Sequence, residues 1–236
     1  MVLTCRLIAA IFVKQFIHIK LKAMKNHIIF IVSTLLSCLP LSFVSAQNIL
    51  VEEHFVENDK GWNLGEDKDV KRSIENGRLV MESKKYTIEN GVHKSKGGYW
   101  IKMPESKLPA DNYSITFTTR WKKNMKNDEK YSPYGMILGD YYFLVYADGD
   151  RRLLKWDTTA KKYETIVDWG VQAAINKKDL ADNNWEIRYQ DGKAAFYGNG
   201  NMLYKKEILI PKDTYIKLYV ENSEVVAFDD IVVKKL

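Results

Sequence analysis

The ten residues Tyr113–Lys122, with the sequence YSITFTTRWK, decide the fold class of this chain. Large apolar or aromatic side chains recur along one side of the stretch, at Tyr113, Ile115, Phe117 and Trp121. The opposite side carries only serine, threonine, arginine and lysine. Successive side chains of a β-strand point to opposite faces of its sheet, so this period of two predicts a strand with one buried face.

The same alternation appears elsewhere in the chain. Trp185, Ile187 and Tyr189 alternate with polar residues. Asp191–Gly192 then reverses the chain into Lys193–Tyr197, which predicts a hairpin with a tight turn. Further strands are expected at residues 50–55, 72–75, 78–83, 98–103, 134–139, 141–147, 151–156, 162–168, 202–208, 215–220 and 225–233.

Short turn signals separate these runs. They are Asn76–Gly77, Asn90–Gly91, Gly97–Gly98, Asp148–Gly149, Asp191–Gly192 and Gly198–Gly200. Only residues 171–180 suggest a helical turn. About twelve short strands with almost no helix predict an all-β fold, a two-sheet antiparallel jelly-roll sandwich.

A predicted export signal precedes this domain. Met24–His27 is a short basic start, Ile28–Phe43 is apolar and uncharged, and Val44–Ala46 supplies small residues before Gln47. This order is typical of a secretory signal peptide, so residues 24–46 are expected to be removed and residues 47–236 to form the mature domain. We therefore expect export to the periplasm, the cell surface or the medium.

Three alternatives for the leader stay open. Residues 1–23 are expected to be an upstream translation, but they could be a genuine extension. Leu35–Cys38 loosely resembles a lipoprotein cleavage box, which would anchor the protein by a lipid. An uncleaved membrane anchor is the third alternative, although Pro40 and the small residues before Gln47 argue against it. The mature domain itself is not expected to be embedded in a membrane.

The charge of the chain belongs largely to the leader. The whole sequence has 36 basic and 30 acidic residues, but the first 46 residues hold five of the basic ones and none of the acidic. Residues 47–236 therefore carry 31 basic against 30 acidic side chains. A nucleic-acid partner is not expected, because such binding needs a basic stripe on the folded domain. Cys5 and Cys38 also precede Gln47, which excludes disulfides and cysteine zinc sites from the mature domain.

The second half of the domain has a recognisable order of strands and turns. Asn184–Arg188 is followed by Asp191–Lys193 and Phe196–Gly200, and the chain ends on Val226–Val233, with the sequence VAFDDIVV. This pattern resembles the concanavalin A-like lectin/glucanase superfamily, especially its laminin-G-like secreted bacterial domains. The resemblance covers residues 134–236 best and implies a jelly-roll sandwich with one concave sheet. Its members include lectins, carbohydrate-binding modules, glucanases, polysaccharide lyases and adhesion domains, so the fold alone does not specify function.

No catalytic pattern emerges from the residues. Glucanases on this fold carry a strand of the form E-x-D-x-x-E, which sets two carboxylates on one face. Glu164 and Asp168 share a face but lack the central acid, and the adjacent Asp229 and Asp230 are expected to face opposite sides. The mature domain has two histidines, His54 and His93, without metal-ligand spacing, and both are expected to be ordinary surface residues. No catalytic residue, cofactor or transition metal is therefore predicted.

A structural calcium ion is the alternative considered where oxygen-bearing side chains cluster. Glu57–Asp59 and Glu66–Asp69 are two such clusters, and Asp229–Asp230 is a third. Calcium takes six to eight oxygen ligands, and a structural ion is therefore a possible cofactor. The alternative is that these carboxylates are simply solvated loop residues.

The aromatic residues offer the best candidates for ligand binding. All six tryptophans and all fourteen tyrosines follow residue 61. Aromatic rings can stack on sugar rings while polar neighbours bond the hydroxyl groups, although such rings also fill sandwich cores. Tyr142 and Tyr146 are favoured, because Phe143 and Val145 are expected to take the core side of their strand. The candidates for one ligand face are Arg120, Trp121, Tyr134, Tyr142, Tyr146, Lys155, Trp156, Asp168 and Trp169.

Two functions remain after this reasoning. The first is a secreted, non-catalytic, lectin-like module that binds carbohydrate or a cell-surface protein through a concave sheet. The second is a hydrolase or lyase acting on glycans. The missing carboxylate pair favours the first function over the second.

Overall fold

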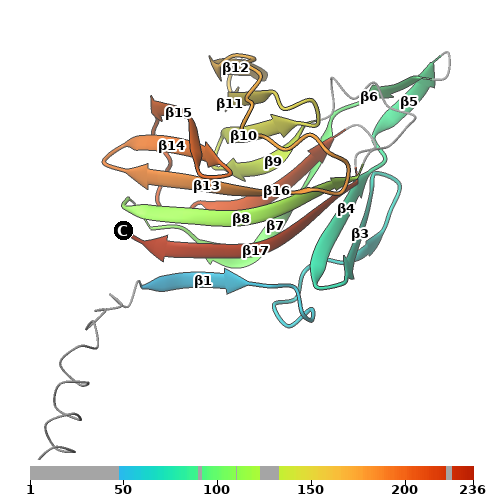
Figure 1. Ribbon diagram of the computed structural model, residues 1–236, viewed down its shortest axis with the longest axis horizontal. Coiled ribbons are helices and arrows are strands. Elements are labelled where there is room, and N and C mark those ends of the chain that lie inside the picture. Colours follow the sequence, from blue (N-terminus) through green and yellow to red (C-terminus); the bar gives the residue numbers. More distant parts are fainter. Residues whose placement is uncertain (1–47, 90–91, 110, 123–132, 222–224) are drawn as a thin grey trace, which may run out of the picture. The chain divides into compact units, whose positions relative to one another are not determined.

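The computed structural model describes residues 48–89, 92–109, 111–122, 133–221 and 225–236, with only the backbone for residues 92–95. The predictions for the leader, including the signal peptide and the lipoprotein box, lie outside these residues, as does the side chain of His93. Within the described ranges the structure is built from strands and turns (Figure 1). In these ranges we find no helix with the length and apolar character that crossing a bilayer requires.

The larger of two main sheets has nine strands. The sheet is antiparallel, with β15 at one edge and β2 at the other. Strand β1 is not part of this row and pairs with β17. The strands, in spatial order, are β15 (Asn201–Glu207), β14 (Lys193–Gly198), β13 (Asp182–Gln190), β8 (Tyr113–Lys122), β17 (Val225–Lys235), β4 (Arg78–Ser83), β3 (Val70–Glu75) and β2 (Gly65–Glu66), with β1 (Ile49–Glu53).

The second main sheet has six strands and packs against the first. Its order is β12 (Lys162–Val167), β11 (Arg151–Asp157), β10 (Tyr141–Tyr146), β9 (Pro133–Leu138), β16 (Tyr215–Glu221) and β7 (Gly98–Lys107). A separate hairpin of β5 (Tyr86–Glu89) and β6 (Val92–Ser95) extends from the sandwich (Figure 1). Two antiparallel sheets face to face confirm the predicted all-β sandwich.

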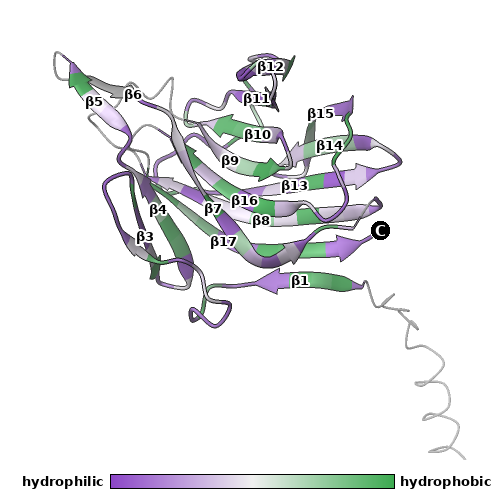
Figure 2. Ribbon diagram, turned by 180° about the vertical axis from the view of Figure 1, so that it is seen from behind, coloured by the Kyte–Doolittle hydropathy of each residue, from purple (hydrophilic) through white to green (hydrophobic). Residues whose placement is uncertain are grey.

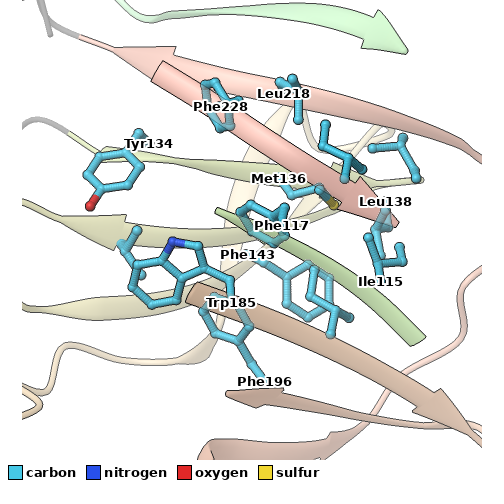
Figure 3. Packing of buried hydrophobic residues seen from close by; sticks show 14 of the residues in the cluster. Ile115, Phe117, Tyr134, Met136, Leu138, Phe143, Trp185, Phe196, Leu218 and Phe228 are labelled. Atoms are coloured by element: carbon cyan, nitrogen blue, oxygen red, sulfur yellow. The ribbon is translucent and has the colours of Figure 1, made fainter. Parts of the chain in front are cut away.

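The core lies between the two sheets. Trp185 and Phe196 stack with ring centroids 5.6 Å apart, and Phe143 from the six-stranded sheet meets Phe196 edge-on at 5.8 Å (Figure 3). Purple and green segments alternate along many strands in Figure 2, as the period of two requires. The alternation in Tyr113–Lys122 is confirmed, because its large apolar and aromatic side chains are all buried.

Every stretch expected to be a strand overlaps one in the structure, with ends that differ by a few residues. The described residues form seventeen strands, whereas about twelve were expected. The individual stretches named above account for fourteen of them, and the three that were not expected, β2, β5 and β6, are short. Residues 171–180 contain turns and no helix, which corrects the expected helical turn. Positive φ angles at Asn76, Gly77, Asp191 and Gly192 match tight hairpin turns at the two predicted places.

Strand β17 changes partner in its middle. Its first residues pair with β4 and its last residues with β1, while β8 runs along its other side. Between Asp229 and Val232 the register against β8 shifts, and Asp230 has a φ of 49°. This extra residue is a β-bulge, which breaks the alternation. Asp229 lies 3.5 Å from Arg78, and Asp230 lines the outer surface beside Thr116 and Thr118. The two aspartates share one face, and the expectation that they face opposite sides is wrong.

Candidate functional site

The outer face of the six-stranded sheet carries a second apolar cluster, separate from the core. Along β10, Phe143 and Val145 point into the core, whereas Tyr142, Leu144 and Tyr146 point outward. This is the assignment predicted for Tyr142 and Tyr146. The buried members of the outer cluster are Ile137, Leu144, Tyr146, Leu154 and Tyr219, with Tyr142 packed against them.

Aromatic rings surround this cluster in a continuous series of contacts. Tyr142 meets Tyr163 edge-on at 5.1 Å and Tyr219 edge-on at 5.6 Å, measured between ring centroids. Tyr163 in turn meets Trp156 at 4.9 Å. Such edge-to-face pairs stabilise an aromatic group beyond its burial alone. The rings therefore hold one another in place on the surface of the sheet.

A hollow of about 300 Å³ opens among these rings. On β9, Gly135 has Leu144 and Tyr219, two residues that line the hollow, as its cross-strand partners and places no side chain between them. A Cβ atom at position 135 would lie 2.1 Å from the carbonyl oxygen of Phe143, so only glycine fits. The lining residues are Pro133, Tyr142, Leu144, Tyr146, Arg152, Leu154, Tyr163, Trp169, Tyr219 and Glu221.

Arg152 and Trp169 form the rim on one side. The Arg152 guanidinium carbon lies 4.4 Å from the centroid of the Trp169 ring, and Trp169 lies 4.5 Å from the ring of Tyr146. Arg152 Nη2 also donates to Thr165 Oγ1 at 3.1 Å and lies 3.6 Å from Asp168 Oδ1. The guanidinium thus joins a stacked ring, a hydroxyl and a carboxylate at the edge of the hollow.

Burial raises the pKa of three tyrosine hydroxyls that line the hollow. Burial raises the pKa of Tyr146 to about 12, although its hydrogen bond with Arg152 acts in the opposite direction. Burial also raises the pKa of Tyr163 and of Tyr219 above the usual value. At neutral pH these hydroxyls are neutral groups that can donate and accept hydrogen bonds.

Comparisons with known proteins agree with this architecture. No protein-family model and no curated protein matches the sequence. Among solved structures, a Bacillus subtilis protein with a galectin-like fold superposes with a TM-score of 0.54 at 10% identity, covering 80% of this chain and 96% of its own. The carbohydrate-binding module CBM66 from Bacillus subtilis gives 0.52 at 9% identity, covering 73% and 98%. A laminarinase from Flavobacterium sp. UMI-01 gives 0.51 at 16% identity, covering 80% and 100%.

The chain has the concanavalin A-like fold. This fold is shared by carbohydrate-binding modules and by enzymes that act on glycans, so it does not by itself decide between them. The identities of 9% to 16% show a common architecture only.

The concanavalin A-like sandwich brings together about half of the residues predicted for one ligand face. Tyr142, Tyr146, Trp156 and Trp169 lie on the outer face of the six-stranded sheet, with Asp168 exposed at the rim. Trp121 and Tyr134 do not join them, because both are buried in the core between the sheets, 5% and 2% exposed (Figure 3 for Tyr134). The prediction that these two rings share the ligand face is therefore wrong.

Two predicted polar partners also lie elsewhere. Arg120 is on the outer face of the nine-stranded sheet, where its guanidinium bonds both oxygens of Asp182 at 3.0 and 2.8 Å. Asp182 also accepts a hydrogen bond from Arg78. The hydrogen bond from Arg120, and to a smaller extent the one from Arg78, lowers the pKa of the Asp182 carboxyl. Lys155 pairs with Tyr141, whose ring belongs to the core, so it lies on the other side of β11. Neither residue can contact a ligand in the hollow.

Sequence reasoning missed other members of the hollow. Tyr163, Tyr219 and Arg152 were placed on strands but were not assigned to the ligand face. Tyr219 alternates with Leu218 and Val220, so its side was visible in the sequence. The residues that surround Tyr219 could not be predicted from the sequence, because the strand order β10–β9–β16 brings together residues that are far apart in the chain.

The acidic loops have structural roles. Asp67 Oδ1 accepts from the backbone N–H groups of Asp69 and Val70, and Asn58 Oδ1 accepts from that of Trp62. Across the ranges that the structure describes, no three side chains of the types His, Cys, Asp and Glu gather as a metal site. His54 is a surface residue, as expected, and its imidazole contacts Asp230 and Glu52 there.

Proposed function

We propose that this protein is an exported, non-catalytic module that binds carbohydrate in the hollow on the outer face of the six-stranded sheet. The observation that carries the proposal is the placement of the rings. Tyr163 and Trp169 are 46% and 40% exposed on a face that does not contribute to the core between the sheets. Rings held open to solvent beside a hollow are ready to cover the apolar face of a sugar.

The polar groups around the rings suit the same ligand. A sugar presents hydroxyl groups at its edges, which need donors and acceptors when water is removed. Arg152 and the neutral Tyr146 hydroxyl can supply donors, and Glu221 can accept. A few polar groups converging on an apolar hollow of this volume are typical of small-molecule sites. The similarity in fold to a carbohydrate-binding module supports this proposal.

Two features favour binding over catalysis. Glycosidases that act through two carboxylates need a pair of acids beside the scissile bond. Among the described residues that line the hollow, Glu221 is the single acid. A lyase that used a tyrosine as base would need a lowered pKa, whereas burial raises the pKa of Tyr163 and Tyr219. The hydrolase or lyase remains the second candidate because a laminarinase shares the fold.

A glycan array followed by calorimetry tests the proposal. We expect Tyr163→Ala and Trp169→Ala each to weaken binding about tenfold, because each removes a stacking surface. Tyr197→Ala is the matched control, since Tyr197 lies on the outer face of the nine-stranded sheet. Equal losses in all three variants, or no glycan bound at all, would refute the site. Release of reducing ends, or of unsaturated uronic acids, from a bound glycan would establish the enzymatic alternative.

A further inference from the structure

The aromatic surface continues beyond the hollow onto β16 and β7. Tyr219, at the wall of the hollow, has Trp100 of β7 as its cross-strand partner. Residues directly opposite in an antiparallel pair share a face, so Trp100 extends the outer surface. Its ring is 46% exposed. On β16, Lys217 and Tyr215 lie on the same side as Tyr219, at steps of two residues.

Three lysines gather on this extension. Lys217 Nζ lies 4.5 Å from the centroid of the Trp100 ring. Lys102 Nζ and Lys107 Nζ lie 4.2 and 5.9 Å from the centroid of the Tyr215 ring. We call Lys102, Lys107 and Lys217 the lysine cluster. Ring faces attract ammonium groups, which explains how the cluster is held on the surface.

The cluster contains an arrangement that is unfavourable without a partner. Lys102 and Lys217 are directly opposite each other in the ladder between β7 and β16. Like charges placed directly opposite on one face of a sheet destabilise it. In the ranges that the structure describes, none of the three ammonium groups has a carboxylate within ion-pair distance. Two other described lysines do have such a partner, Lys84 with Glu66 and Lys193 with Glu207.

The position of the cluster links it to the hollow. Lys217 is two residues from Tyr219 on one strand, a separation of about 7 Å at the rise of a β-strand. Trp100 lies beside both residues. A chain of sugars that fills the hollow and crosses β16 would therefore pass over Trp100 and meet the three ammonium groups.

We infer that the ligand of this surface is an anionic glycan, with carboxylate or sulfate groups set over the lysine cluster. Its uncharged ring faces cover Tyr163, Trp169 and Trp100, and its anionic groups relieve the repulsion between Lys102 and Lys217. Charge-assisted hydrogen bonds from ammonium groups to such anions are stronger than neutral ones. The inference rests on the proposed carbohydrate-binding function and narrows its ligand class.

Matched pairs of glycans provide the test. β-1,4-linked polyglucuronate is compared with cello-oligosaccharides, and κ-carrageenan with desulfated κ-carrageenan, since each pair differs chiefly in charge. We expect the charged member to bind at least tenfold more tightly at low salt, with the difference shrinking as salt screens the charges. The variant Lys102→Gln/Lys217→Gln should lose about tenfold in affinity for the charged glycan and much less in affinity for its neutral counterpart.

The control variant is Lys205→Gln/Lys206→Gln, which removes the same charge from edge strand β15 of the other sheet. Equal losses of affinity for the charged glycan in the two double variants would show a general attraction of polyanions and overturn the inference. Binding of polyglutamate, a polyanion without sugar rings, as tightly as the charged glycan would do the same. Binding of the neutral member alone would also overturn it while leaving the proposed function intact. Failure of every glycan to bind would refute both. Circular dichroism and melting temperatures establish that each variant is folded.

Discussion

The ring of Tyr219 lies against the backbone of Gly98 on the neighbouring strand. A Cβ atom at position 98 would be only 2.2 Å from Cζ of that ring. The absence of a side chain at Gly98 therefore allows Tyr219 to form one wall of the hollow. Trp100, two residues further along β7, then carries the aromatic surface outward.

Gly98→Ala should displace the Tyr219 ring and weaken glycan binding several-fold. Since φ of Gly98 is not positive, alanine fits its backbone, and the effect comes from the displaced ring. Overpacking of this kind destabilises the fold by about 1 kcal/mol, because the flexible end of the ring can move. Calorimetry and denaturant unfolding of Gly98→Ala, Tyr219→Ala and the double variant measure both effects.

The double variant provides the control. Once Tyr219 is alanine, the additional change at Gly98 should have little effect on affinity or on the free energy of unfolding. If Gly98→Ala has the same effect in both backgrounds, it does not act through the Tyr219 ring.

Thr119→Val should destabilise the sandwich through the core. The indole Nε1 of Trp185 donates to Thr119 Oγ1 at 2.7 Å, and both residues are buried. Valine keeps the shape but leaves the N–H without a partner, which is expected to lower the free energy of unfolding by about 1–3 kcal/mol. Thr118→Val is the control, since Thr118 bonds the exposed Asn184 on the outer face, and its effect should stay within about 0.5 kcal/mol. Similar losses in both variants would contradict a special role for the buried bond.

Alkaline unfolding should depend on Tyr146. Burial raises its pKa in the folded state to about 12, above the value near 10 of the unfolded chain. Its contribution to stability is therefore complete below pH 10 and is lost as the pH rises toward 12. Between these values the wild type should lose more stability than Tyr146→Phe, which cannot ionise. Denaturant unfolding at pH 8 and pH 11 measures this, with Tyr197→Phe as control. Parallel losses in all three proteins would refute the prediction.

From the sequence we could predict the face of the strand on which a side chain lies. Which residues become neighbours in the fold was harder to predict. Alternation separated Tyr142 and Tyr146 from Phe143 and Val145, because a period of two is a local property of the strand. It could not show that Arg120 belongs to the other sheet, since strand order is set by packing across the whole chain.

Local irregularities account for the remaining errors. The bulge at Asp230 adds a residue to β17 and reverses the expected side of that aspartate. The β5–β6 hairpin was missed although Asn90–Gly91 was noted as a turn, because its flanks YTIE and VHKS are too short to show a clear alternation in the sequence. Trp121 and Tyr134 were misassigned because aromatic side chains suit a core and a binding surface equally well.

His54 should make the fold more stable in mild acid than in mild base. Its Nδ1 lies 2.8 Å from Asp230 and its Nε2 3.1 Å from Glu52, so it joins the end of β1 to the bulge in β17. The hydrogen bond with Asp230, followed by that with Glu52, raises the pKa of His54 above 6.5. A raised pKa means that the stabilisation is complete below about pH 6.5 and is lost as the pH rises through the pKa of the folded state.

Melting temperatures of the wild type and His54→Gln at pH 5.5 and pH 8.5 measure this effect. The wild type should exceed the variant at pH 5.5, and the difference should shrink at pH 8.5, where glutamine and neutral histidine both bond without charge. Because the imidazole is half exposed, added salt should also reduce the difference at pH 5.5. A difference that grows as the pH rises would mean that the neutral imidazole is the stabilising form, and would overturn the assignment of His54 as an ion-pairing link between β1 and β17.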